Sequence, residues 1–204
     1  MSIFQNTCKP EGLGGKLMVN MMNKGHAAMA AWGFEHINVS QDSYCLDIGC
    51  GGGANVKKLL EKAPEGKVTG VDYSPVSVEK TEKVNRAAIQ AGRCQVFEGN
   101  VMNLDFPEHS FDLATAFETI YFWPDISKAF REVFRVLRPG GVFMVCNESD
   151  GYNPSDEKWT QIIDGMRVYR AEEIREAMTG AGFTDVSVDQ NEKHWLCLVG
   201  HKEK

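Results

Sequence analysis

The stretch LDIGCGGG, Leu46 to Gly53, decides the fold because a short apolar run leads directly into a cluster of glycines. Tyr44–Ile48 predicts a strand and residues 54–63 predict a helix, so the glycines lie in a strand-to-helix turn. Glycine lets the backbone of such a turn approach a ligand closely and direct its amide groups at it. Asp72 follows at the end of the next apolar run, where a carboxylate accepts hydrogen bonds from both ribose hydroxyls of a nucleoside. The pattern predicts a nucleoside-binding crevice.

Short apolar runs alternate with helical patterns along the rest of the chain, which is typical of an α/β fold with a parallel sheet. Further strands are predicted at 67–72, 94–98, 111–117 and 142–146, and helices at 75–91, 127–137 and 171–181. Residues 138–141, Arg-Pro-Gly-Gly, separate one of these helices from the strand that follows it. The last two predicted strands, 185–188 and 195–200, flank a short polar turn and predict an antiparallel hairpin at the sheet edge.

The segment before the first strand differs in character. Residues 18–32 predict one helix rich in Met and Ala, interrupted by Gly25, that lies beside the sheet rather than in it. We therefore expect a single domain over residues 1–204, with a helical lid at 1–43 and the sheet-based core at 44–204.

Two classes of nucleoside cofactor fit a glycine turn of this kind. The nicotinamide fingerprint G-x-G-x-x-G/A is matched by Gly49, Gly51 and Ala54. Asp47 stands two residues before this turn in a buried run, and its carboxylate would repel a pyrophosphate but attract an ammonium or sulfonium group. The turn therefore favours S-adenosylmethionine over a dinucleotide.

Composition excludes several classes of function. The chain has 204 residues and a net charge of −6, and an acidic chain without a basic stripe disfavours a nucleic-acid partner. No apolar run is long enough to cross a bilayer, and the N-terminus lacks the pattern of a signal peptide, so we expect a cytoplasmic protein that does not bind membranes. The six cysteines form no CxxC pair and are expected to be reduced. The oligomeric state stays open.

Five motifs in order resemble the class I S-adenosylmethionine-dependent methyltransferases. They are LDIGCGGG, VTGVDYS at 68–74, EGNVMNLDF at 98–106, SFDLATAFETIYFWPD at 110–125 and REVFRVLRPGGVFMV at 131–145. The resemblance covers about residues 44–200. It implies a three-layer, Rossmann-like, doubly wound sheet of seven strands, mostly parallel, with an antiparallel strand in a C-terminal hairpin.

The same resemblance implies which residues surround the cofactor. Residues implied at its methionine end are Asp47, Gly49, Cys50, Gly51, Ala116 and Phe117. Asp72 would hold the ribose and Tyr73 would lie along the adenine. Asn100 and Val101 would bracket the adenine edge, although the family often has an aspartate where this chain has Asn100.

Methyl transfer from a sulfonium is an in-line displacement, so the protein must mainly position the acceptor and exclude water. A general base is needed only for an acceptor that loses a proton, and no metal is required. His36, His109, His194 and His201 show no ligand-like spacing, so we predict no zinc site.

The acceptor is expected beside the segment ETIYFWPD, at the carboxyl end of the fourth strand. Glu118 and Tyr121 are candidate catalytic residues in an aromatic wall that suits a flat or weakly cationic acceptor, although both could instead be structural. Phe122 and Trp123 more often pack a following helix onto the sheet. His26 is a candidate general base, although a structural histidine is more common.

Some acceptors and functions are disfavoured. Residues 116–119 read Ala-Phe-Glu-Thr and lack the Asn/Asp-Pro-Pro-Tyr/Phe turn of DNA adenine and protein glutamine methyltransferases. No large target-recognition domain is present, so a small-molecule acceptor is predicted. The alternatives are a nicotinamide-dependent oxidoreductase and a non-catalytic module that binds S-adenosylmethionine.

Overall fold

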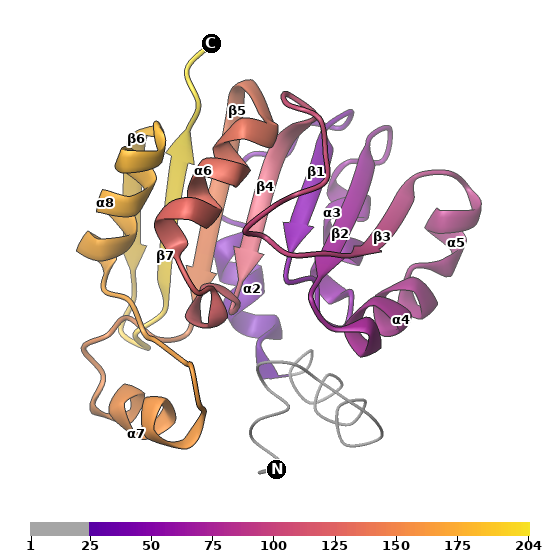
Figure 1. Ribbon diagram of the computed structural model, residues 1–204. Helices are drawn as coiled ribbons and strands as arrows, with labels where there is room; N and C mark the ends of the chain where they lie inside the picture. Colours follow the sequence, from indigo (N-terminus) through magenta and orange to yellow (C-terminus); the bar gives the residue numbers. More distant parts are fainter. Residues whose placement is uncertain (1–24) are drawn as a thin grey trace.

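A seven-stranded sheet runs through the computed structural model, which describes residues 25–204 (Figure 1). Its strands are β1 (Tyr44–Ile48), β2 (Lys67–Asp72), β3 (Cys94–Glu98), β4 (Phe111–Phe117), β5 (Leu137–Asn147), β6 (Thr184–Gln190) and β7 (Leu196–His201). The helices are α2 (Ala27–Gly33), α3 (Ala54–Lys62), α4 (Pro75–Val84), α5 (Arg86–Gln90), α6 (Ile126–Val136), α7 (Pro154–Ile162) and α8 (Ala171–Ala181), with a 3₁₀ turn η2 (Ile120–Phe122).

The strand order is β3-β2-β1-β4-β5-β7-β6. The pairs from β3 to β5 are all parallel, whereas β7 runs antiparallel to both β5 and β6. The sheet reverses its order between β1 and β4, and ligands of open α/β sheets bind at such a point, beyond the carboxyl ends of the strands. The predicted Rossmann-like fold, including its antiparallel C-terminal strand, is confirmed.

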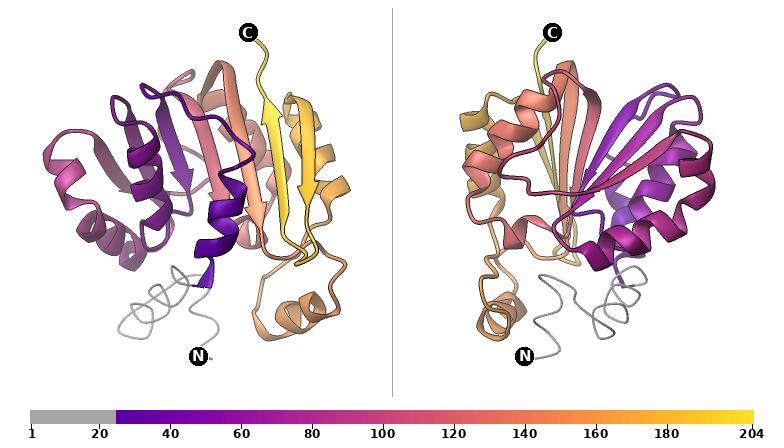
Figure 2. Two further views of the ribbon diagram at one scale, coloured as in Figure 1. Left: turned by 180° about the vertical axis from the view of Figure 1, so that it is seen from behind. Right: turned by 45° about the vertical axis from the view of Figure 1, so that its right-hand side comes forward.

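Helices cover both faces of the sheet and make three layers. In Figure 1 α6 and α8 lie in front of the sheet, and the view from behind in Figure 2 shows α2 and α3 on the other face. Strand β5 shows why both faces are apolar: Phe143 and Val145 belong to the core under α6 and α8, whereas Met144 and Cys146 belong to the core under α2 and α3. Alternate residues of a strand point to opposite faces, so a strand covered on both sides has an unbroken apolar run.

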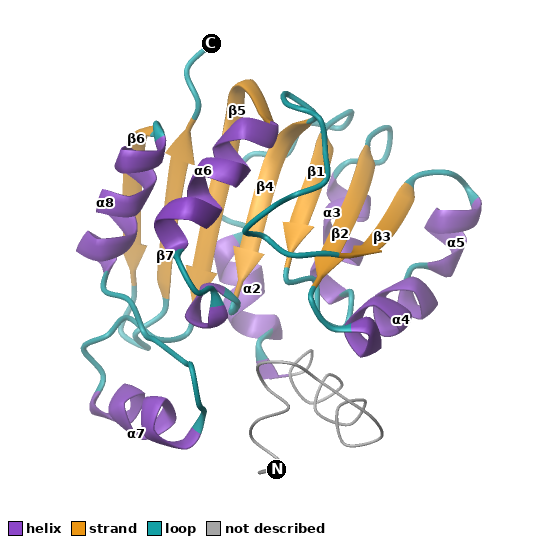
Figure 3. Ribbon diagram, viewed as in Figure 1, coloured by secondary structure: helices purple, strands orange, loops and turns teal. Residues whose placement is uncertain are grey.

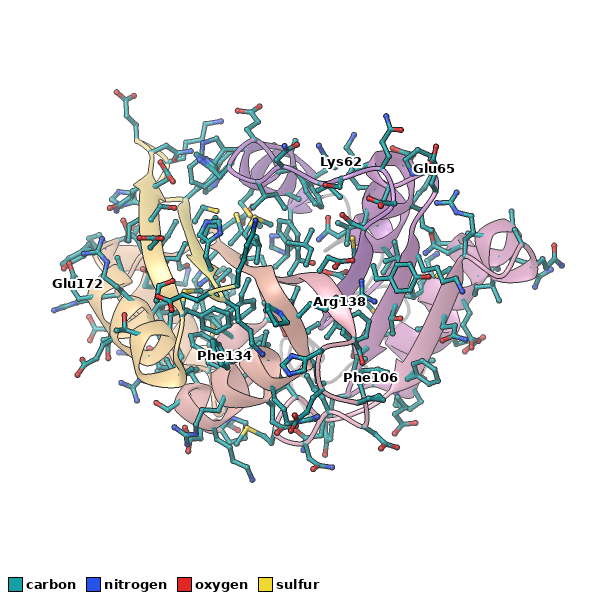
Figure 4. The ribbon with its side chains drawn as sticks, turned by 90° about the horizontal axis from the view of Figure 1, so that it is seen from above. Lys62, Glu65, Phe106, Phe134, Arg138 and Glu172 are labelled. Atoms are coloured by element: carbon teal, nitrogen blue, oxygen red, sulfur yellow. The ribbon has the colours of Figure 1, made fainter. Side chains whose placement is uncertain are left out.

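The end of the sheet from which the parallel strands start is closed by polar contacts. Figure 4 looks onto this end, with Lys62 and Glu65 on the α3 side, Phe134 on the α6 side and Arg138 between them. Arg138 Nη1 lies 2.8 Å from both carboxylate oxygens of Asp112, and its guanidinium stacks on the ring of Tyr44. These contacts join β5, β4 and β1, and they leave the opposite end of the sheet for a ligand.

Three elements differ from the predictions. The helix predicted at 75–91 is divided at Asn85, because the buried Asn85 amide donates to the carbonyls of Gly53 and Thr81 and so anchors the chain beneath the glycine turn. Strand β5 starts at Leu137 instead of 142, with residues 138–141 bulging between its two paired segments. Helix α7 was not predicted.

The helix predicted at 18–32 is observed as α2, which begins at Ala27, and the part before residue 25 lies outside the described residues. No helix in the described part of the chain combines the length and the apolar character needed to span a membrane.

Candidate active site

A pocket of about 580 Å³ opens at the carboxyl ends of β1, β2 and β4. Figure 3 shows that loops follow these strand ends, and α2 lies beside them. One end of the pocket is lined by the glycine turn and by residues after β2 and β3, and the other by α2 and the segment after β4. The pocket therefore joins the predicted nucleoside site to the predicted acceptor site.

The backbone of the glycine turn has a conformation that residues with a side chain rarely adopt. Gly49 and Gly51 have φ angles of 73° and 52°, in the left-handed region that glycine adopts without strain. A Cβ on Gly49 would overlap the side chain of Thr119, whose own Cβ would be only 2.7 Å away. A Cβ on Gly51 would meet only the Gly49 carbonyl oxygen, at 3.9 Å. The space that Gly51 leaves open belongs to the pocket, as a cradle for a ligand requires.

Gly49→Ala is expected to lower the free energy of unfolding by about 2–3 kcal/mol, because it adds backbone strain and a clash with Thr119. Gly180→Ala is the matched control, since Gly180 lies in α8 with open space around it. That change should stabilise the protein by up to about 1 kcal/mol, since alanine favours a helix. Urea unfolding of both variants checks this. Equal stabilities of Gly49→Ala and wild type would contradict the strained turn.

Asp72 lies at the end of β2 and faces the pocket. Its Oδ2 accepts the Gly51 amide at 2.8 Å and its Oδ1 accepts the Ser74 amide at 2.9 Å. Burial raises the pKa of the carboxyl, and the hydrogen bonds from Ser74 and Gly51 oppose that rise. Asp72 therefore connects the glycine turn to the start of α4 and still presents its carboxylate to the pocket.

The residues predicted to surround an adenine lie at one end of the pocket. Tyr73, Asn100 and Val101 all line it, and Tyr73 is the most exposed of the large side chains there. Asn100 Oδ1 accepts the Met102 amide at 2.9 Å, which fixes the orientation of the side-chain amide. An oriented amide and an exposed ring are groups that can flank a flat base.

Asp47 lies beneath the glycine turn and does not line the pocket. Thr115 Oγ1 donates to its Oδ1 at 2.7 Å, whereas Oδ2 is buried and has no hydrogen-bond partner among residues 25–204. Burial raises the pKa of Asp47 to about 7. An unsatisfied buried acceptor below a ligand-sized pocket fits a cationic ligand such as the amino acid portion of S-adenosylmethionine, and does not fit a pyrophosphate.

The raised pKa of Asp47 has a consequence for stability. A carboxyl whose pKa is higher in the folded than in the unfolded state binds more protons when folded, so its contribution to stability falls as the pH rises from about 4 to about 7. Asp47→Asn removes this ionisation and keeps an acceptor for Thr115. Between pH 5 and pH 8 the stability of the variant relative to wild type should improve by about 2–3 kcal/mol. Urea unfolding at the two pH values tests this, and a constant difference would contradict it.

Three ionisable side chains meet at the end of the pocket where the acceptor is predicted. His26 is the N-cap residue of α2, Glu118 follows β4 and Glu148 follows β5. His26 Nδ1 lies 3.7 Å from Glu118 Oε2 and 3.2 Å from Glu148 Oε2. Burial lowers the pKa of His26. The hydrogen bond with Glu148 and the charges of both carboxylates together raise it by more, so the net shift is upward.

Glu118 is held firmly in this cluster. Its φ angle is 55°, which is rare for a residue with a side chain and typical of functional positions. Its Oε1 accepts hydrogen bonds from the Tyr121 hydroxyl, at 3.0 Å, and from the Glu148 amide. Burial raises its pKa to about 7. A carboxyl that titrates near neutral pH at a pocket wall suits proton transfer.

Only part of the expected aromatic wall lines the pocket. Tyr121 is buried behind Glu118, and its hydroxyl also accepts the Ser149 amide at 3.1 Å, so it orients Glu118 and does not line the pocket. Phe122 and Trp123, which the sequence predicts to pack a helix onto the sheet, instead line the pocket, and Trp123 also packs edge-on against Phe130. The aromatic wall of this segment therefore consists of Phe122 and Trp123, without Tyr121.

Most other predicted site residues line the pocket, namely His26, Gly49, Cys50, Gly51, Asp72, Tyr73, Asn100, Val101, Phe117 and Glu118. Ala116, like Asp47, is buried behind the wall. Burial raises the pKa of the Cys50 thiol well above its usual range, so this thiol is unreactive. Glu148, Thr119 and Phe34 were not named individually as site residues, although Thr119 lies within the segment ETIYFWPD beside which the acceptor is expected. For Glu148 a signal existed, because it follows a strand at the carboxyl edge of the sheet.

Sequence comparisons agree with the fold and the glycine turn. Residues 46–145 match the family model of a methyltransferase domain. The chain is 26% identical over 156 residues to a sterol 24-C-methyltransferase of Aspergillus fumigatus, covering 72% of this chain and 41% of that protein. It is 35% identical over 113 residues to a sterol 4-C-methyltransferase of Caenorhabditis elegans, covering 54% of this chain and 33% of that protein. The chain thus spans less than half the length of these relatives.

Solved structures share the fold. A putative methyltransferase of Haloferax volcanii, in complex with the Trm112 methyltransferase activator, matches with a TM-score of 0.82 and 22% identity, over 92% of this chain and 94% of that one. The geranyl diphosphate C-methyltransferase of Streptomyces coelicolor, solved with Mg²⁺, geranyl-S-thiolodiphosphate and S-adenosyl-L-homocysteine, matches with a TM-score of 0.73 and 14% identity, over 86% of this chain and 76% of that one.

The sheet and the glycine turn define a Rossmann-like protein with a pocket at the switch point of its sheet. With the family match and the relatives, they establish that the chain belongs to the class I S-adenosylmethionine-dependent methyltransferases.

Proposed function

We propose that this protein transfers the methyl group of S-adenosylmethionine to a small-molecule acceptor. The observation that carries the proposal is one continuous pocket with the glycine turn and Asp72 at one end and the His26–Glu118 pair at the other. The relatives named above act, by their names, on sterols, and this supports a small acceptor for the present chain.

The residues fit the cofactor in three groups. Asp72 would accept hydrogen bonds from the ribose hydroxyls, while Tyr73, Asn100 and Val101 would enclose the adenine. The methionine end would be held by Gly49, Cys50, Gly51 and Phe117, with Asp47 and Ala116 buried behind them. Bound there, S-adenosylmethionine supplies a methyl group on a sulfonium, so that bonding of the acceptor to the methyl carbon breaks the carbon–sulfur bond and leaves its electron pair on sulfur.

The protein would contribute acceptor placement and proton removal. Phe122 and Trp123 provide a flat apolar wall beside Glu118, which suits a flat or weakly cationic acceptor. Glu118, held by Tyr121 and paired with His26, would take the proton that an acceptor hydroxyl or amine releases on methylation. This assigns Glu118 and His26 to proton transfer and makes Tyr121 a positioning residue.

We infer the remaining properties from the sequence. An acidic chain without a basic stripe supports an enzyme that does not bind nucleic acid, and the expectation of a cytoplasmic enzyme that does not bind membranes is kept as part of the proposal. A single domain with the segment before β1 as its lid would place His26 over the pocket.

Calorimetric titration of the purified protein with S-adenosylmethionine, S-adenosylhomocysteine and NADH tests the cofactor. We expect saturable binding of both sulfur nucleosides and none of NADH. Incubation with S-adenosylmethionine carrying a deuterated methyl group and a small-molecule extract then tests transfer, with mass spectrometry detecting labelled products. Binding of NADH alone would replace the proposal with an oxidoreductase. Cofactor binding without any labelled product would leave a non-catalytic module.

A further inference from the structure

The cluster of His26, Glu118 and Glu148 has a geometry that methyl transfer itself does not require. One ligand-type atom from each residue lies within 4.8 Å of the other two, and the three residues come from separate segments of the chain. Side chains of the three are 30%, 14% and 34% exposed, so a small ion could reach them from solvent. His26 and Glu118 also line the pocket.

The separations suit a shared ion. With metal–ligand bonds of about 2.0–2.2 Å, neighbouring ligand atoms lie about 3–3.6 Å apart. His26 Nδ1 is 3.2 Å from Glu148 Oε2 and 3.7 Å from Glu118 Oε2, so small side-chain rotations would place all three atoms around one centre.

Hydrogen bonds hold the Glu118 carboxylate in an orientation that suits metal binding. Glu118 Oε1 is occupied by the Tyr121 hydroxyl and the Glu148 amide, and this directs Oε2 toward His26. The Tyr121 hydroxyl is itself held by the Ser149 amide. Hydrogen-bonded partners behind the ligands are a regular feature of protein metal sites, because they fix the ligand orientation.

The carboxylates of the cluster have no lysine or arginine partner in the described part of the chain. Among residues 25–204, no Lys or Arg forms an ion pair with Glu118 or Glu148. Within the same range His26 is the one cation-forming group that pairs with them, so the cluster carries a net negative charge when both carboxylates are ionised. A divalent cation would compensate that charge in a site partly shielded from water.

We propose that His26, Glu118 and Glu148 bind one divalent transition-metal ion at the acceptor end of the pocket. An imidazole nitrogen with two carboxylate oxygens suits ions of the Mn²⁺-to-Zn²⁺ series, whereas Mg²⁺ and Ca²⁺ prefer sites made of oxygen alone. Three protein ligands leave coordination positions open toward the pocket, where an acceptor oxygen can bind. The bound ion would polarise that oxygen and so help an acceptor hydroxyl to release its proton.

Mn²⁺ is the probe of choice because it avoids thiol ligands. Titration of the full chain with MnCl₂, followed by electron paramagnetic resonance, should give one site per chain. Glu148→Gln and His26→Gln should each weaken Mn²⁺ binding at least tenfold. Glu176→Gln, a change on the exposed face of α8, is the matched control and should bind as wild type does. MgCl₂ should bind more weakly than MnCl₂.

Thermal unfolding and S-adenosylhomocysteine binding are measured on the same samples. Glu148 does not line the pocket, so Glu148→Gln should keep cofactor affinity while it loses Mn²⁺. No Mn²⁺ binding by wild type, or equal binding by wild type and both site variants, would overturn the metal site. Failure of the cofactor to bind would instead overturn the proposed function, and the two results are independent.

Discussion

Asp72→Ala is expected to weaken the binding of S-adenosylhomocysteine by about 100-fold, or about 3 kcal/mol. The carboxylate would lose charged hydrogen bonds to the ribose, each worth about 1.5–3 kcal/mol. It would also release the Gly51 and Ser74 amides, so the glycine turn would lose its attachment to α4. Calorimetric titration measures the affinity directly.

Asp72→Asn and Glu176→Ala complete this test. Asparagine keeps one acceptor oxygen, so its affinity should fall between those of wild type and Asp72→Ala. Glu176 is exposed on α8, away from the pocket, and its replacement should leave the affinity unchanged. Wild-type affinity in Asp72→Ala would show that the nucleoside does not bind at the end of β2.

Glu118→Gln is expected to reduce turnover by about 10²–10⁴-fold, the usual contribution of a general base, while cofactor affinity stays within about twofold. The amide oxygen of glutamine can still accept from Tyr121 and from the Glu148 backbone, so the loop should keep its shape. The pKa of Glu118 near 7 predicts that wild-type turnover rises from pH 6 to pH 8, as the carboxylate becomes available to accept a proton. Methyl transfer to an acceptor found by deuterium labelling gives the rates.

Tyr121→Phe is the matched variant, because it removes only the hydroxyl that holds Glu118. Its turnover should fall less than that of Glu118→Gln, with cofactor affinity again retained. Unchanged turnover in Glu118→Gln would remove Glu118 from the reaction, and loss of cofactor affinity would place it in the cofactor site instead.

The nucleoside half of the site could be predicted because its signals are local. The glycines follow β1 within a few residues, and Asp72 ends the very next strand, so a turn and a strand end are enough to bring them together. The sheet could be predicted for the same reason, since alternating apolar runs and helical patterns mark each unit separately.

The acceptor half depends on contacts between distant segments. Glu148 meets Glu118 and His26 only because β5 ends beside β4 and α2 covers both, and no spacing in the sequence encodes that meeting. The buried position of Tyr121 is accompanied by hydrogen bonds of its hydroxyl with Glu118 and with the Ser149 amide. The run of aromatic residues in the sequence does not show which of them makes such contacts. The break at Asn85 likewise comes from its bonds to the glycine turn, 32 residues earlier.

Strand β7 has a consequence for how the protein is made. It lies between β5 and β6, although it follows both in the chain, and β6 pairs with no other strand of residues 25–204. Until residues 196–201 leave the ribosome, β5 therefore has an unpaired apolar edge and β6 has no neighbour. The parallel strands β3-β2-β1-β4-β5 can pair before that point, so the edge at β5 is the last part of the sheet to be covered.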